Sequence, residues 1–142
     1  MAELEARTAA GAERTRPLSP HLQIYKPMLT MMMSIMHRVT GAALYFGMLL
    51  LAWWLIAAAA GPNAYANVEW FMGSLFGRLV LFGYTWALIH HMLGGLRHLI
   101  WDTIHGFEPA ERELLTLASL IGSTTLTLVL WVVGYLVMGG PR

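Results

Sequence analysis

The chain has 142 residues, of which 57% are hydrophobic and only 12% are charged, against roughly a quarter in a typical soluble domain. Its net charge of +1 gives no reason to expect a nucleic-acid partner, and the absence of cysteine excludes thiolate-held iron–sulfur clusters, c-type haem attachment and disulfides. The composition is that of a membrane protein, in which any redox chemistry would depend on the six histidines.

Residues 1–29 are expected to form a segment outside the hydrocarbon. The first 16 residues contain three glutamates and no apolar core, which argues against a signal peptide and against an acid-poor transit peptide. Prolines at positions 17, 20 and 27 then predict an extended or turning stretch that lies along the membrane surface.

Residues 30–142 are expected to form one membrane domain. Each of its three helices contains an apolar stretch near the roughly 20 residues that cross a bilayer, and the helices are predicted at about 30–60, 71–102 and 113–138. Thr30 is a plausible N-cap, Gly61 and Pro62 are expected to end the first helix, and a short polar loop is expected over 61–69. The predicted fold is an all-α membrane protein with three transmembrane helices and an N-terminal cytoplasmic segment.

The distribution of positive charge predicts the orientation. Lys and Arg gather in the N-terminal segment and near the second loop, whereas the first loop region and the tail hold only Arg78 and Arg142. By the positive-inside rule the N-terminus and the second loop face the cytoplasm or matrix. The lack of a presequence favours a bacterial inner membrane, with the mitochondrial inner membrane as the alternative.

A first polar cluster consists of Ser34, His37, Arg38 and Gly41, which share one helix face because they are spaced i, i+3, i+4 and i+7. Ionisable residues in a spanning helix are costly and usually face a cavity, cofactor or partner. Two interpretations stay open. The residues meet lipid phosphates at the interface, or they form a polar pocket at the cytoplasmic edge that suits a quinone headgroup or a haem propionate.

A second cluster consists of His91, Gly95, His98 and Asp102, again on one helix face. A neutral imidazole can bind haem iron, and a glycine one turn away lets a porphyrin edge approach the helix. The alternative is a histidine that forms a hydrogen bond across a helix interface. His90, about 100° around the helix, is not excluded as the ligand by spacing alone.

The depths of the histidines limit what the chain could do alone. Counted from Asp102, His91 lies 11 residues inside its helix, roughly 16 Å, whereas His37 lies only a few residues inside the first helix. The two would then differ in depth by roughly 10 Å, although two axial ligands of one iron must be about 4 Å apart. His37 is therefore expected to reach a propionate at most, and a second axial ligand would have to come from another subunit.

Three strings carry a resemblance to a known family: RPLSPHLQIY (Arg16–Tyr25), SIMHRVTG (Ser34–Gly41) and HMLGGLRHLIWD (His91–Asp102). They resemble the signature regions of the cytochrome b subunit of succinate dehydrogenase, and the resemblance covers the chain from Arg16 through the third helix. It implies that His91, rather than His90, is the axial haem ligand. It also implies that Ser34 and Arg38 contact a quinone, and that His37 lies near the haem propionates.

The same resemblance implies a membrane complex of four subunits. A flavoprotein oxidises succinate, an iron–sulfur protein carries the electrons, and this chain and a second small anchor share one haem b and help to form a ubiquinone site. The chain would thus belong to an enzyme without holding its catalytic core, surrounded by membrane lipid. Two alternatives remain: a fumarate reductase anchor that works in the opposite direction, and a non-redox membrane scaffold for a soluble dehydrogenase.

Overall fold

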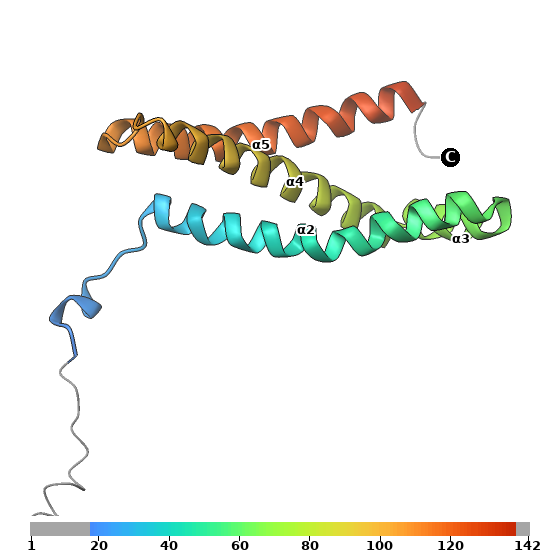
Figure 1. The fold of residues 1–142 in the computed structure, drawn as a ribbon, viewed down its shortest axis with the longest axis horizontal. Coiled ribbons are helices and arrows are strands. Elements are labelled where there is room, and N and C mark those ends of the chain that lie inside the picture. Colours follow the sequence, from blue (N-terminus) through green and yellow to red (C-terminus); the bar gives the residue numbers. More distant parts are fainter. Residues whose placement is uncertain (1–17, 139–142) are drawn as a thin grey trace, which may run out of the picture.

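The structure is a computed structural model in which residues 18–138 are described. These residues form one short 3-10 helix and four α-helices, and no strand occurs among them (Figure 1). In chain order the elements are η1 (Pro20–Gln23), α2 (Leu29–Ala60), α3 (Pro62–Gly73), α4 (Leu75–Asp102) and α5 (Pro109–Met138). Helix α4 slants between α2 and α5 and packs against both.

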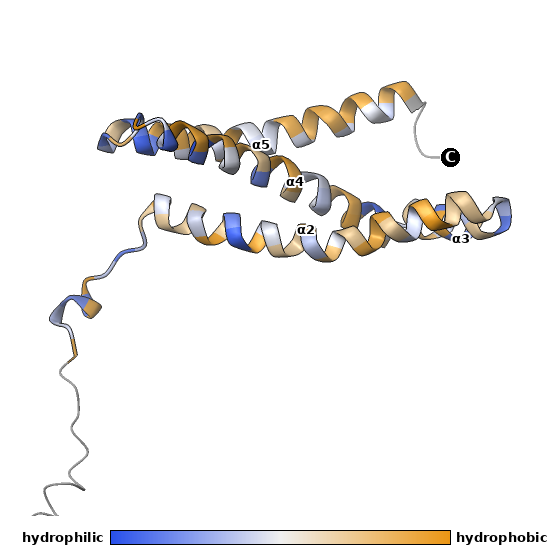
Figure 2. Cartoon of the chain, in the orientation of Figure 1, coloured by the Kyte–Doolittle hydropathy of each residue, from blue (hydrophilic) through white to orange (hydrophobic). Residues whose placement is uncertain are grey.

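Helices α2, α4 and α5 are each long and apolar enough to cross a membrane, which confirms the predicted all-α membrane protein with three spans. Figure 2 shows hydrophilic residues in blue near the connection between α4 and α5 and at one turn of α2, while white to orange dominates the rest of these two helices, α2 and α5. With 32 residues, α2 is about 48 Å long, more than the roughly 30 Å of hydrocarbon, so its ends extend into the headgroup region or beyond.

The expected loop over 61–69 was wrong, because that stretch belongs to helix α3. Gly61 has a φ of 110°, a conformation that L side chains rarely adopt, and it turns the chain sharply after α2. Pro62 then occupies the first turn of α3, where its missing N–H costs nothing. The proline expected to stop one helix starts the next, and α3 packs back on α2 with Phe71 edge-on to Trp53 at 5.5 Å.

A tight turn at Ser74 separates α3 from α4, so the second spanning helix begins at Leu75 rather than near residue 71. The Ser74 hydroxyl accepts a hydrogen bond from the Gly77 N–H at 3.0 Å and donates one to the Phe71 carbonyl at 2.6 Å. A Cβ on Gly77 would collide with that same carbonyl oxygen, so the turn requires glycine at this position.

Small polar side chains line the seam between α4 and α5. Thr116, Ser119, Ser123 and Thr127 are buried on α5 and share one helix face. Such residues let two helices approach closely, which agrees with a packing role for this helix. The indole N–H groups of Trp86 and Trp131 donate across the seam to threonine hydroxyls, each at 3.3 Å.

The ends of the helices differ from the sequence expectations by a few residues. Helix α2 begins at Leu29 after an extended Met28, without a side-chain cap from Thr30, and α5 begins at Pro109 rather than near residue 113. Within the predicted surface segment, residues 18–28 are exposed and contain the single turn η1. The predictions for residues 1–17 lie outside the described residues.

Candidate functional site

Two histidines from different helices meet where α2 crosses α4. The rings of His37 and His91 are stacked, with centroids 4.0 Å apart and an angle of 1° between their planes. The expected depth difference of roughly 10 Å is therefore wrong, and so is the argument that depth keeps the two side chains apart.

The error came from assuming that both helices end at one level and run parallel. Eight residues of α2 precede His37, roughly 12 Å, whereas 11 residues of α4 follow His91, roughly 16 Å. Helix α4 also slants across α2 (Figure 1), so length counted along a helix does not equal depth in the bilayer.

A backbone carbonyl of α2 fixes the imidazole of His91. Its Nδ1 lies 3.1 Å from the carbonyl oxygen of His37 and 3.4 Å from the hydroxyl of Thr40. The Thr40 side chain is only 2% exposed, and its own hydroxyl donates to the carbonyls of Met36 and His37. Because a carbonyl only accepts, this contact places the His91 proton on Nδ1 and leaves the Nε2 lone pair available to a metal, the usual arrangement for a metal-binding histidine.

His37 and His91 cannot bind the same metal ion in this arrangement. The lone pair of an imidazole nitrogen lies in the plane of its ring, so a bound metal lies close to that plane. Two stacked, parallel rings share no such point. The expectation that His37 is not the second axial ligand thus has a geometric reason, although a different one from depth.

Glycines on both helices allow the histidines to pack. A Cβ on Gly41 would lie 2.9 Å from Cε1 of His91, and a Cβ on Gly94 would collide with the His37 ring. At Gly95, the glycine singled out in the sequence, a Cβ would meet nothing within 4 Å in residues 18–138. Gly94 therefore serves the packing inside the chain, whereas Gly95 leaves the helix accessible to a group from outside it.

The other predicted site residues surround this pair at the same end of the bundle. The ring of His98 is exposed and lies 5.4 Å from that of His37. Ser34 is half-buried and Arg38 is exposed, one turn apart on α2. Asp102, the last residue of α4, is exposed. The structure thus brings His37, His91 and His98 together and leaves Ser34 and Arg38 beside them at the surface of this chain.

His90 faces a different helix from His91. Its side chain is 1% exposed, its Nδ1 lies 3.0 Å from the hydroxyl of Ser123 on α5, and its ring stacks on Trp86 at 4.8 Å. Because the Ser123 hydroxyl already donates to the Leu120 carbonyl, His90 acts as the donor in this contact. His90 is thus a satisfied residue of the α4–α5 interface.

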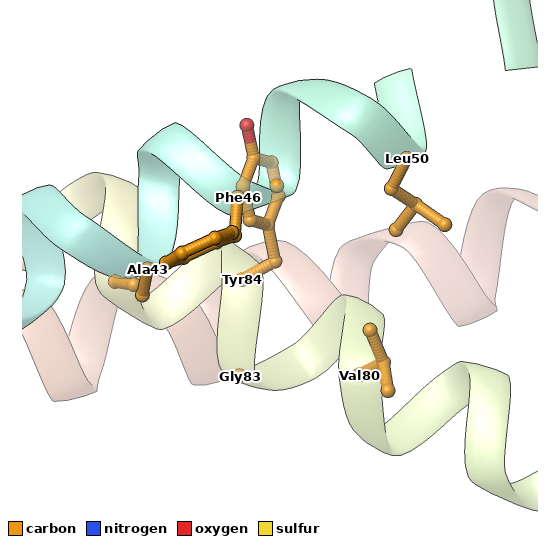
Figure 3. Close-up of a pocket in the computed structure, with 8 residues that line it drawn as sticks. Ala43, Phe46, Leu50, Val80, Gly83 and Tyr84 are labelled. Atoms are coloured by element: carbon orange, nitrogen blue, oxygen red, sulfur yellow. The ribbon is translucent and has the colours of Figure 1, made fainter. Parts of the chain in front are cut away.

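An apolar groove of about 330 Å³ lies between α2 and α4 (Figure 3). Four small residues form much of its lining: Ala43, Gly47, Gly83 and Ala87. The aromatic side chains of Phe46 and Tyr84 also line it. Gly47 is needed because a Cβ there would collide with the Tyr84 ring. Ala87 is one turn before His91, so the groove begins where the histidine cluster ends.

Comparison with known proteins shows the family of this chain. The family of succinate dehydrogenase/fumarate reductase transmembrane subunits matches residues 12–131. The succinate dehydrogenase cytochrome b556 subunit of Paracoccus denitrificans is 43% identical over 118 residues, which cover 83% of this chain and 91% of the relative. The subunit of the same name from Rickettsia conorii is 38% identical over 117 residues, covering 82% and 91%. The chain belongs to this family. It is therefore a membrane subunit of an enzyme complex.

Several residues near the histidines of this succinate dehydrogenase anchor could not be identified from the sequence. Thr40 belongs to the motif Ser34–Gly41 but has no role in the helix-face argument, and its contact with His91 appears only once α2 and α4 are packed. Gly94 was overlooked in favour of its neighbour Gly95. Arg97, within the string HMLGGLRHLIWD, was given no role from the sequence, and its side chain is buried.

Proposed function

We propose that this chain is the larger of two membrane anchors of a succinate:quinone oxidoreductase, with one half of a haem b site and part of a ubiquinone site. The supporting observation is the environment of His91. In a chain related to cytochrome b556 subunits, His91 lies within a spanning helix with Nδ1 bound to a backbone carbonyl and Nε2 free, one turn from an accessible glycine, Gly95. That donor set fits an axial ligand of haem iron.

The second axial ligand would come from the smaller anchor. His37 stacks on His91 with parallel planes, which disfavours iron binding by both, and His90 is engaged with Ser123 on the far side of α4. His37, Arg38 and His98 would then be available to the carboxylates at the haem edge. Haem b supplies a one-electron redox centre when it is bound.

The apolar groove offers a place for the apolar edge of the porphyrin. Its floor of glycine and alanine, starting at Ala87, would admit a flat ring close to the helices. The polar residues at the opposite side of His91 would meet the carboxylates. The site would thus have an apolar end for the porphyrin ring and a polar end for the carboxylates, as an amphipathic haem requires.

Ser34 and Arg38 would serve the quinone. A serine hydroxyl can donate a hydrogen bond to a quinone oxygen, and the arginine can stabilise negative charge that develops on the oxygen during reduction. Both lie at the exposed edge of α2, where the iron–sulfur subunit would complete the site. Succinate oxidation would take place in the flavoprotein subunit, with electrons reaching the quinone through the clusters of the iron–sulfur subunit.

The proposed orientation has the N-terminus in the cytoplasm and the chain in a bacterial inner membrane. Lys and Arg residues before α2, and Arg97 and Arg112 in the helices that flank the α4–α5 connection, support it through the positive-inside rule. The bacterial relatives support the location. Because these relatives are named as succinate dehydrogenase subunits, they favour succinate oxidation over the fumarate reductase alternative.

A reduced-minus-oxidised visible spectrum tests the proposal. The complex is purified through a tag on this chain from membranes that contain all its partners, and succinate is used as the reductant before dithionite. We expect a reducible b-type haem in a stoichiometric amount. A complex that holds the soluble dehydrogenase but contains no haem would instead support the non-redox scaffold.

A further inference from the structure

The carbonyl oxygen of His37 is approached by more hydrogen-bond donors than it has lone pairs. Nδ1 of His91 lies 3.1 Å from it and the hydroxyl of Thr40 lies 3.0 Å from it. Within α2 the regular partner of the same carbonyl is the N–H of Gly41, four residues along the helix. A carbonyl oxygen has two lone pairs, so the three donors must share them. Each hydrogen bond is therefore weaker than it would be with fewer competitors.

The hydroxyl of Thr40 is a donor in this arrangement. Its single proton lies between the carbonyl oxygens of Met36 at 2.9 Å and His37 at 3.0 Å. The direct distance from this hydroxyl to Nδ1 of His91 is 3.4 Å, which exceeds the roughly 2.7–3.2 Å usual for an N–H···O hydrogen bond. Nδ1–H therefore donates mainly to the carbonyl, and Thr40 acts on His91 through the oxygen that they share.

Burial of Thr40 means that solvent cannot replace its hydroxyl. The residue is 2% exposed, and it lies where α2 and α4 are close enough that a Cβ on the next residue, Gly41, would lie 2.9 Å from the His91 ring. Valine has nearly the shape of threonine and no hydroxyl. Thr40→Val would thus remove one of the three donors and leave the carbonyl oxygen to the other two.

The strength of the hydrogen bond from Nδ1 affects the other nitrogen of the His91 ring. When Nδ1–H donates more strongly, the imidazole becomes more electron-rich and Nε2 becomes a more basic ligand. A more basic axial ligand stabilises the oxidised iron and lowers the reduction potential of a haem. A donor that competes for the same carbonyl oxygen has the opposite effect.

We propose that Thr40 is a positioning residue that limits the basicity of His91 and thereby raises the reduction potential of the haem bound there. The inference rests on the proposed function, in which His91 is an axial ligand. Thr40 does not contact the iron. It acts through the carbonyl of His37, for which its hydroxyl competes with Nδ1–H of His91.

The test compares Thr40→Val, Thr40→Ser and Thr127→Val in the assembled complex. The serine variant keeps the hydroxyl. Thr127 is the matched control, because it is also buried and its hydroxyl also donates to the carbonyl four residues earlier, but on α5, away from the His37 carbonyl. The haem midpoint potential, haem content and subunit composition are measured. Loss of the competing donor should favour the oxidised haem by about threefold, which at 59 mV per tenfold for a one-electron couple lowers the potential by about 28 mV.

The expected pattern is a lower potential in Thr40→Val, the wild-type potential in Thr40→Ser and Thr127→Val, and full haem content in all three. A wild-type potential in Thr40→Val would overturn the proposal. So would a higher potential, because the hydroxyl would then be an acceptor for Nδ1–H. If Thr40→Val does not assemble, the same criteria apply to Thr40→Ala, and loss of haem from both variants shows a purely structural role and overturns the proposal. Failure of the proposed function is distinct, because the wild-type complex would then contain no haem.

Discussion

Adjacent histidines of α4 face different helices and should respond differently to the same replacement. His91 faces α2 with Nε2 free, whereas His90 is bound to Ser123 of α5. We expect His91→Gln to remove an axial bond and to shift or abolish the low-spin b-type spectrum. His90→Gln should cost about 1 kcal/mol of stability for one altered hydrogen bond and leave the spectrum largely intact.

The matched pair makes this measurement specific, since both changes replace a buried or half-buried imidazole with the same amide. Electron paramagnetic resonance of the oxidised complexes would separate six-coordinate low-spin haem from high-spin haem. A low-spin signal that survives in His91→Gln and disappears in His90→Gln would mean that the ligand is one residue earlier in the chain. The site would then face α5.

Changes at Ser34 and Arg38 should damage quinone chemistry without emptying the haem pocket. Ser34→Ala removes one hydrogen bond, worth about 1 kcal/mol, or more if a quinone oxygen is left unpaired. Arg38→Leu should have the larger effect, because it removes the charge proposed to stabilise the quinone oxygen during reduction. Two activities are compared on the same membranes: succinate oxidation with a soluble acceptor, and succinate reduction of a quinone analogue.

We expect the first activity to persist in both variants and the second to fall steeply in Arg38→Leu, with haem content retained. Wild-type quinone reduction in both variants would remove Ser34 and Arg38 from the quinone site. It would favour the alternative in which these residues meet lipid phosphates at the interface.

Where α2 crosses α4, the close contact depends on a missing side chain. A Cβ on Gly94 would collide with the His37 ring. The backbone carbonyl of His37 accepts the hydrogen bond from Nδ1 of His91, so His37 also orients the His91 ring. We expect Gly94→Ala to cost roughly 1–3 kcal/mol through overpacking and to lower haem occupancy by displacing α2 from α4. Gly134→Ala on α5 is the control, because its Cβ would meet nothing within 4 Å among the described residues. Equal haem content and thermal stability in the two variants would contradict this packing.

The connection between α4 and α5 contains a strained residue. Ile104 has a φ of 63°, in the left-handed region that a β-branched side chain rarely adopts, directly after the end of α4. Asn tolerates this conformation far better, so Ile104→Asn should raise the stability of the complex by roughly 1–2 kcal/mol. A thermal unfolding curve of the purified complex measures the change. A lower midpoint would show that contacts of the Ile104 side chain stabilise the complex by more than its left-handed backbone conformation destabilises it.

The three spanning helices were predictable because length and composition alone define a membrane span. Helix α3 was not, since Gly61 and Pro62 end one helix and equally start another, and only packing against α2 decides between a loop and a helix. Helix periodicity also placed Ser34, His37 and Arg38 on one face and His91 and His98 on another. These groupings depend on a single helix and need no knowledge of its neighbours.

Contacts between helices were beyond the sequence. The stacking of His37 on His91 depends on how far each helix extends past the crossing and on its slant, and neither follows from helix length. The same holds for the Thr40 contact and for the role of Gly94, because both are defined by the partner helix. The choice between His90 and His91 came from the family resemblance, and their different neighbours in the structure supply a physical reason for it.

Considered as a whole, the described chain leaves one end of its bundle incomplete. His98 and Arg38 are exposed there. Lipid cannot satisfy such groups within the hydrocarbon, because it offers them neither charge nor hydrogen bonds. A second anchor and a haem would meet both needs, so the chain is expected to be stable and haem-loaded only within its complex.

The most direct test of whether this chain supplies only half of the haem site is to express it with and without the second anchor. The haem is then examined by electron paramagnetic resonance. With the second anchor we expect a stable membrane protein with six-coordinate, low-spin haem. Without it we expect little haem and no six-coordinate signal, because in the proposed site this chain supplies a single axial ligand, His91. A stable, fully six-coordinate haem protein recovered from this chain alone would contradict the account.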